Sequence, residues 1–132
     1  MVISQGYISY FIVSLLSFCI LDGIWLGVIA KEFFKRYLGP LMRSDFQWWA
    51  AGLFYLIFSA SFVYFVALPA REGSAWQAAL RGAFFGFTAY AAYDLTNLAT
   101  LKGFPPIVVA VDLVWGASIC AVTALVCYYS IK

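Results

Sequence analysis

Three aspartates, Asp22, Asp94 and Asp112, lie inside long apolar stretches of the chain. A carboxylate near the centre of a membrane-spanning helix costs roughly 2.5–3.5 kcal/mol on insertion scales, so each needs a partner, a cavity or a function. If successive stretches cross a membrane in opposite directions, all three acids fall in the same half of the bilayer. We therefore expect their carboxylates to converge on one site.

Aromatic and polar residues share helical faces with these acids. Asp94 belongs to a stripe with Gly82, Gly86, Tyr90 and Asn97, because residues three or four apart lie on one face of a helix. A tryptophan follows Asp22 and Asp112 at the same spacing, and Tyr55 lies about two turns inside another stretch. The predicted binding site contains Asp22, Trp25, Tyr55, Tyr90, Tyr93, Asp94, Asn97, Asp112 and Trp115.

Two kinds of chemistry suit this set. Clustered carboxylates in a low dielectric cannot all ionise, so they would hold a proton or capture a cation, and Trp and Tyr faces attract organic cations. Alternatively, Asp22, Asp94, Asn97 and Asp112 offer the hard oxygen ligands that Mg²⁺, Ca²⁺ or Mn²⁺ prefer. The chain contains no histidine, which excludes heme-His sites, zinc-His sites and His-based catalysis.

The same residues also have a purely structural interpretation. Each aspartate could accept an indole N–H and lock the bundle, and Lys102 could pair with Asp94. The Gly82-to-Gly86 spacing forms a GxxxG pattern, which predicts close approach to another helix. Cys19, Cys120 and Cys127 lack metal-ligand spacing, and we expect them to be buried free thiols.

The elements that must position these residues are four apolar stretches of bilayer length. They cover about residues 7–30, 48–68, 76–99 and 105–129. Backbone groups in lipid must satisfy their own hydrogen bonds, so at this apolar density helices are expected. The sequence predicts an all-α integral membrane protein, with residues 1–132 forming a single four-transmembrane-helix bundle.

Composition supports a membrane location. Only 11% of the residues are charged, whereas a soluble domain of this size carries about a quarter. This excludes a cytosolic enzyme or a disordered tail, and we expect a lipid bilayer partner and no nucleic-acid partner. The first stretch is longer than a signal-peptide core, so we expect it to be retained.

Basic residues predict an orientation. The polar 31–45 loop and Lys102 lie on one side, called side A, which carries five basic residues; side B carries Arg71, Arg81 and Lys132. The positive-inside rule then predicts that the 31–45 loop is cytoplasmic and that both termini lie outside.

Three segments resemble a bacterial family of small membrane proteins catalogued as domain of unknown function 2177. They are Leu21-Asp22-Gly23-Ile24-Trp25-Leu26-Gly27, the run from Tyr93 to Gly103, and Val111-Asp112-Leu113-Val114-Trp115-Gly116. One departure is Phe104, where the family pattern suggests Trp. The resemblance implies a four-helix protein of the bacterial inner membrane and supplies no established activity.

Three functions remain open at this stage. The first is a cation- or proton-linked binding or transport module, expected to be a homo-oligomer because four helices enclose little space. The second is a lipid-modifying intramembrane enzyme that uses the aspartates as ligands of a divalent cation or as acid and base. The third is an accessory subunit whose polar groups only specify helix packing.

Overall fold

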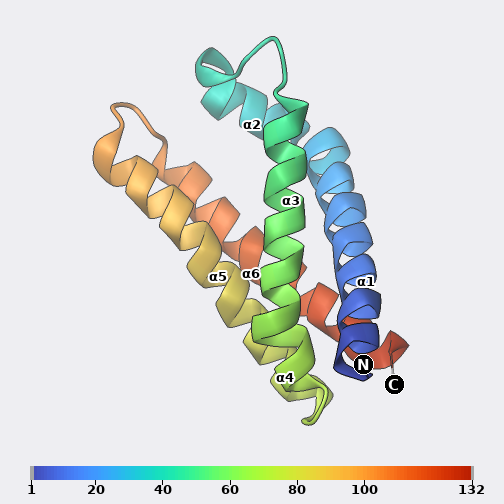
Figure 1. The fold of residues 1–132 in the computed structure, drawn as a ribbon. Coiled ribbons are helices and arrows are strands. Elements are labelled where there is room, and N and C mark those ends of the chain that lie inside the picture. Colours follow the sequence, from blue (N-terminus) through green and yellow to red (C-terminus); the bar gives the residue numbers. More distant parts are fainter. Residues whose placement is uncertain (1, 132) are drawn as a thin grey trace.

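The described chain, residues 2–131 with side chains from residue 6 onward, is helical and contains no strand in a computed structural model (Figure 1). The long helices are α1 (Val2–Ile24), α3 (Trp48–Phe62), α5 (Ala75–Thr100) and α6 (Pro106–Ser130). Shorter elements are the π-helices η1 (Trp25–Ile29) and η3 (Val63–Ala67), the helices α2 (Lys31–Leu38) and α4 (Leu68–Ala70), and the 3-10 turn η2 (Gly39–Leu41).

Three of the described helical segments are long and apolar enough to cross a membrane: Gly6–Ile29, Trp48–Ala70 and Pro106–Ser130. The stretch expected at 76–99 is a helix of sufficient length, α5, but it is not among these three candidate spans. Its mean hydropathy is lowered by polar residues that include Gln77, Arg81 and Asp94. The structure therefore supports an all-helical membrane protein with three candidate spans.

Glycines bring α5 and α6 into close contact along an antiparallel pair (Figure 1). A Cβ atom on Gly86 would overlap the backbone carbonyl oxygen of Gly116, and one on Gly82 would overlap that of Cys120. The close approach predicted from the GxxxG pattern is confirmed, and α6 is the partner. Ser74 and Gln77 form a capping box that fixes the start of α5.

The tightly packed core lies in the half of the molecule nearer the termini. Phe18 and Phe62 contact each other edge to face at 5.1 Å, and both are buried with Val63, Val66 and Ile119. Toward the opposite end, which carries α2 and the turn before α6, the pair α1–α3 diverges from the pair α5–α6 (Figure 1). The end with α2 is side A, so the helices separate in the half where the three aspartates were expected.

Two π-helical segments interrupt the regular helices. The η1 segment begins at Trp25, whose carbonyl accepts the backbone N–H of Ala30 at 2.7 Å. The η3 segment ends two residues before Pro69, a residue that lacks an N–H group and cannot continue a regular hydrogen-bond ladder. Such bulges rotate the side chains that follow them, and they are frequent at functional sites.

The segment expected to be a polar loop at 31–45 contains an amphipathic helix, α2. Its basic and acidic residues Lys31, Glu32, Lys35 and Arg36 are exposed. Its apolar residues are Phe33, Phe34, Tyr37 and Leu38. They pack against a small cluster around the start of α6, which consists of Phe104, Val108 and Val109. Reading the segment as a loop was wrong because the alternation of charged and apolar residues follows the helical period.

The cysteines differ in their environments. Cys120 and Cys127 are buried free thiols, as expected, and the Sγ atom of Cys127 lies 3.3 Å from the Ser14 hydroxyl. Cys19 is exposed, so the expectation of a buried thiol was wrong there. It sits on a lipid-length helix beside exposed Ile20, and both side chains therefore face the surroundings of the bundle.

Candidate functional site

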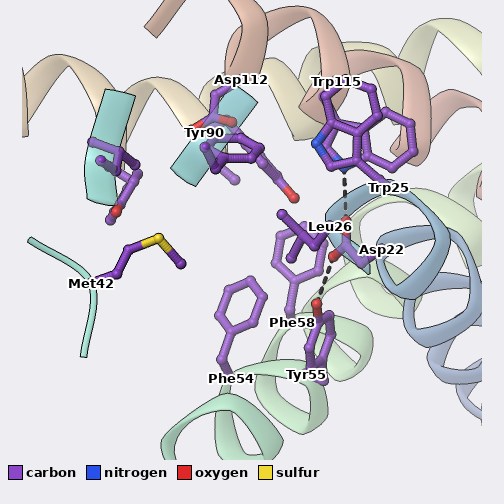
Figure 2. Close-up of a pocket in the computed structure, with 14 residues that line it drawn as sticks. Asp22, Trp25, Leu26, Met42, Phe54, Tyr55, Phe58, Tyr90, Asp112 and Trp115 are labelled. Carbon is purple, nitrogen blue, oxygen red and sulfur yellow. Dashed lines mark hydrogen bonds between the residues drawn. The ribbon is translucent and has the colours of Figure 1, made fainter. Parts of the chain in front are cut away.

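A cavity of about 470 Å³ opens between the diverging helices on side A (Figure 2). Helices α1, α3, α5 and α6 all contribute to it, and α2 with the following segment closes one side. We call it the acid–aromatic pocket because its lining consists of two carboxylates, eight aromatic rings and four aliphatic or sulfur-containing side chains. The lining residues are Asp22, Trp25, Leu26, Phe34, Leu38, Met42, Phe54, Tyr55, Phe58, Ala89, Tyr90, Tyr93, Asp112 and Trp115.

Asp22 is held by donors from two other helices. The Tyr55 hydroxyl on α3 donates to Oδ2 at 2.7 Å, and the Trp115 indole N–H on α6 donates to Oδ1 at 2.8 Å (Figure 2). These two bonds tie α1 to α3 and to α6. Because each carboxylate oxygen can accept further hydrogen bonds, this fixed group can still face a ligand in the pocket.

Trp115 also stacks on Trp25. Their ring centroids lie 4.5 Å apart and the planes differ by only 8°. The Trp25 ring comes from η1, the π-helical continuation of α1, so the bulge places it against α6. The Trp25 indole N–H is buried and has no hydrogen-bond partner in the described residues.

Asp112 faces the pocket from α6 and also meets Asp94. The register set by Gly86 opposite Gly116 places Asp112 opposite Tyr90, one helical turn from the level of Asp94. The carboxyl groups of Asp94 and Asp112 are close enough to influence each other electrostatically. Asp94 is completely buried, and neither of its oxygens receives a hydrogen bond from a donor in the described residues. Lys102, considered as its partner from the sequence, is exposed and forms no ion pair with it.

Seven of the nine residues expected at the site therefore line one cavity. Asp94 and Asn97 do not line it. Asp94 is fully buried near Asp112 of α6, and Asn97 lies farther along α5 toward its end. Whether any of these residues binds a ligand stays a prediction.

The divalent-cation site expected at Asp22, Asp94, Asn97 and Asp112 stays a prediction. Among the described residues, no group of three or more Asp, Glu, Cys or His side chains lies close enough together to hold a metal ion. Both oxygens of Asp22 instead accept hydrogen bonds, from Tyr55 and Trp115. The proposed ligand set of Asp22, Asp94, Asn97 and Asp112 therefore does not form a single three-carboxylate group in this structure.

Comparison with known proteins identifies one family. Residues 7–129 of the chain match a family described as "predicted membrane protein (DUF2177)". The chain belongs to the DUF2177 family. No curated protein and no solved structure was found to match it.

The DUF2177 match covers all fourteen residues of the acid–aromatic pocket. Half of these residues were not anticipated from the sequence: Leu26, Phe34, Leu38, Met42, Phe54, Phe58 and Ala89. Phe34, Leu38 and Met42 could have been found from the apolar spacing in the 31–45 segment. The other four carry no local signal, since apolar residues fill every face of these helices.

Proposed function

We propose that this DUF2177 protein is a membrane binding module that takes an organic cation into the acid–aromatic pocket. One observation carries the proposal: two carboxylates and eight aromatic rings line a single cavity whose lining includes no basic side chain. Ring faces attract cations, and this attraction strengthens when water is excluded. An anion entering the same space would meet the carboxylates without a compensating positive charge.

Asp112 supplies the most direct test. Asp112→Asn keeps the shape of the side chain and removes its charge, so we expect binding of tetramethylammonium to weaken at least about tenfold, equivalent to about 1.4 kcal/mol. Isothermal titration calorimetry measures this change on purified protein in detergent-free nanodiscs made of zwitterionic lipid. Asp45→Asn is the matched control, because Asp45 is an exposed acid paired with Arg43 at 3.1 Å outside the pocket. Equal affinities for the native protein and the Asp112→Asn variant contradict the proposal.

The Asp94–Asp112 pair favours a proton link to this binding. Two carboxyl groups facing each other in a low dielectric cannot both be charged, so the pair would share a proton. A cation beside Asp112 stabilises its charged form, and that proton would then leave. Titrations in buffers with different ionisation enthalpies count released protons, and proton release should disappear in Asp94→Asn. Release of the same number of protons from that variant argues against the link.

The alternative function is a purely structural role in helix packing. The two hydrogen bonds that Asp22 accepts from separate helices favour it. Under this alternative, Asp22→Asn lowers stability and no cation shifts the melting temperature of the native protein. Under the binding proposal, tetramethylammonium raises that temperature by mass action. The two functions therefore differ in the response of the unmodified chain.

We propose that α5 is a fourth span of a bacterial inner-membrane protein. It is less apolar than the other long helices, but it packs against α6 over much of its length. If α6 spans the bilayer, α5 therefore lies at the same depth in the membrane. Four spans put both ends of the chain on side B, and the basic residues around α2 favour a cytoplasmic side A. We also propose that the protein takes part in transport and that it assembles as a homo-oligomer.

A further inference from the structure

The acid–aromatic pocket has two chemically different walls. The carboxylate and hydroxyl groups of the lining come from α1, α3, α5 and α6 and belong to Asp22, Tyr55, Tyr90, Tyr93 and Asp112. Met42 lies across the open space from Asp22 and Trp115, and Phe54 lies beside Tyr55, with the two ring centroids 5.2 Å apart (Figure 2). A ligand that contacts both walls must have a charged end and an apolar end.

The size of the cavity suits an occupant larger than a bare ion. About 470 Å³ falls within the range of pockets that enclose a drug-sized organic molecule. An ammonium group held at Asp22 and Asp112 alone would leave the apolar wall without a contact. Dispersion contacts with that wall therefore require an apolar body attached to the charged group.

The pocket opens through apolar side chains at membrane depth. Leu26 and Phe54 belong to two of the candidate spans, and they are 50% and 47% exposed although they line the cavity. Tyr93 on α5 and Met42 after α2 complete this opening and are also exposed. In a bilayer, such an opening faces lipid chains, so a ligand with an apolar body reaches it by lateral movement.

We propose that the pocket takes an amphiphilic organic cation from the bilayer, with its positive head at Asp22 and Asp112 and its apolar tail between Met42 and Phe54. This inference rests on the proposed function and adds the ligand class, its orientation and its route. The apolar face of α2 contacts the tail, since Phe34 and Leu38 also line the pocket.

Photo-crosslinking tests the orientation. The probe is dodecyltrimethylammonium with a diazirine at the end of its tail, added at a fixed mole fraction to nanodiscs that contain the full chain. Peptide mapping by mass spectrometry should place crosslinks on the segments containing Phe34, Met42 and Phe54. Unlabelled dodecyltrimethylammonium should compete, whereas dodecyl sulfate should not. Because loss of the Asp112 charge weakens binding of the head, crosslinks should fall at least about fivefold in Asp112→Asn and stay unchanged in Asp45→Asn.

The outcomes separate the two proposals. If the tail probe labels the lipid-facing sides of α1 and α3 equally in native and Asp112→Asn protein, while tetramethylammonium still needs Asp112, the amphiphile inference is overturned and the proposed function stands. If neither cation depends on Asp112, both are overturned. Because Asp112→Asn could affect folding, its circular dichroism and elution volume must match those of the native protein. If they do not, Asp22→Asn with the same readouts takes its place.

Discussion

At the scale of single residues, the three aspartates have different surroundings although they carry the same chemical group. Asp22 has a neutral donor on each oxygen, whereas fully buried Asp94 has none and faces Asp112. Asp112 is the residue common to the pocket and to this pair. We therefore expect substitutions of the three acids to give three different phenotypes.

Trp115→Phe isolates the contribution of one donor to Asp22. The substitution removes the indole N–H that Asp22 accepts at 2.8 Å but retains a ring against Trp25. Hydrogen bonds between membrane helices contribute about 0.6 kcal/mol on average and up to about 1.7, so we expect a loss of about 1 kcal/mol. Unfolding from mixed micelles measures it. Trp76→Phe, at an exposed position, is the control, and equal losses for the two variants contradict the assigned role.

The positions of these acids were partly predictable from the sequence. Depth along each helix followed from counting residues between polar ends, and this correctly brought Asp22 and Asp112 toward one region. Rotation of each helix about its axis did not follow, because apolar residues surround every span. Asp94 and Asn97 were therefore placed in the pocket from their shared stripe with Tyr90, whereas neither lines it and Asp94 is fully buried near Asp112 of α6.

At the scale of elements, the close packing of α5 on α6 determines where Asp94 and Asp112 meet. Gly86→Ala should destabilise the protein by about 1–3 kcal/mol, because the added Cβ overlaps the backbone of Gly116 and the helices must move apart. Gly52→Ala on α3 is the matched control. No atom lies within 4 Å of its added Cβ, so helix propensity should make this change neutral or stabilising.

Thermal unfolding in detergent compares these two glycine variants. A Gly86→Ala protein as stable as the Gly52→Ala protein is the result that contradicts the packing argument. The GxxxG spacing predicted a close contact in advance. It did not identify the partner helix, because the pairing of Gly86 with Gly116 joins residues 30 positions apart whose register is set by the turn before α6.

The helix α2 was missed for a different reason. The 31–45 segment was interpreted by its charges, which do mark it as polar, but Phe33, Phe34, Tyr37 and Leu38 repeat at helical spacing within it. A short helix of this kind is stable only when another element covers its apolar face. That cover comes from Phe104, Val108 and Val109, which follow far along the chain.

At the scale of the whole molecule, the fold combines a packed half and an open half. Phe18 and Phe62 hold the helices together toward side B, the pocket occupies side A, and Phe58 belongs to both the core and the pocket lining. The all-helical membrane class was predictable from composition and stretch length alone. The asymmetry between the two halves was not, because it depends on which of many apolar residues contact each other.

The proposed four-span topology has its own test. If α5 crosses the membrane with the three candidate spans, a periplasmic reporter enzyme fused after Tyr129 should be active, and one fused after Arg43 should be inactive. A fusion after Lys102 should also be inactive, since the turn before α6 lies at the same end as α2 (Figure 1). Activity at Lys102 combined with inactivity at Arg43 contradicts a fourth span.

Lys132, counted among the side-B charges, lies outside the described residues.

The stacked pair of Trp25 and Trp115 gives the pocket an optical signature. Two indoles 4.5 Å apart and nearly parallel couple their electronic transitions, which gives rise to an exciton couplet in the circular dichroism spectrum. The other three tryptophans, Trp48, Trp49 and Trp76, are highly exposed and are not part of this stack. Any occupant that separates α1 from α6 would change this couplet, so the protein carries its own label-free reporter of the state of the pocket.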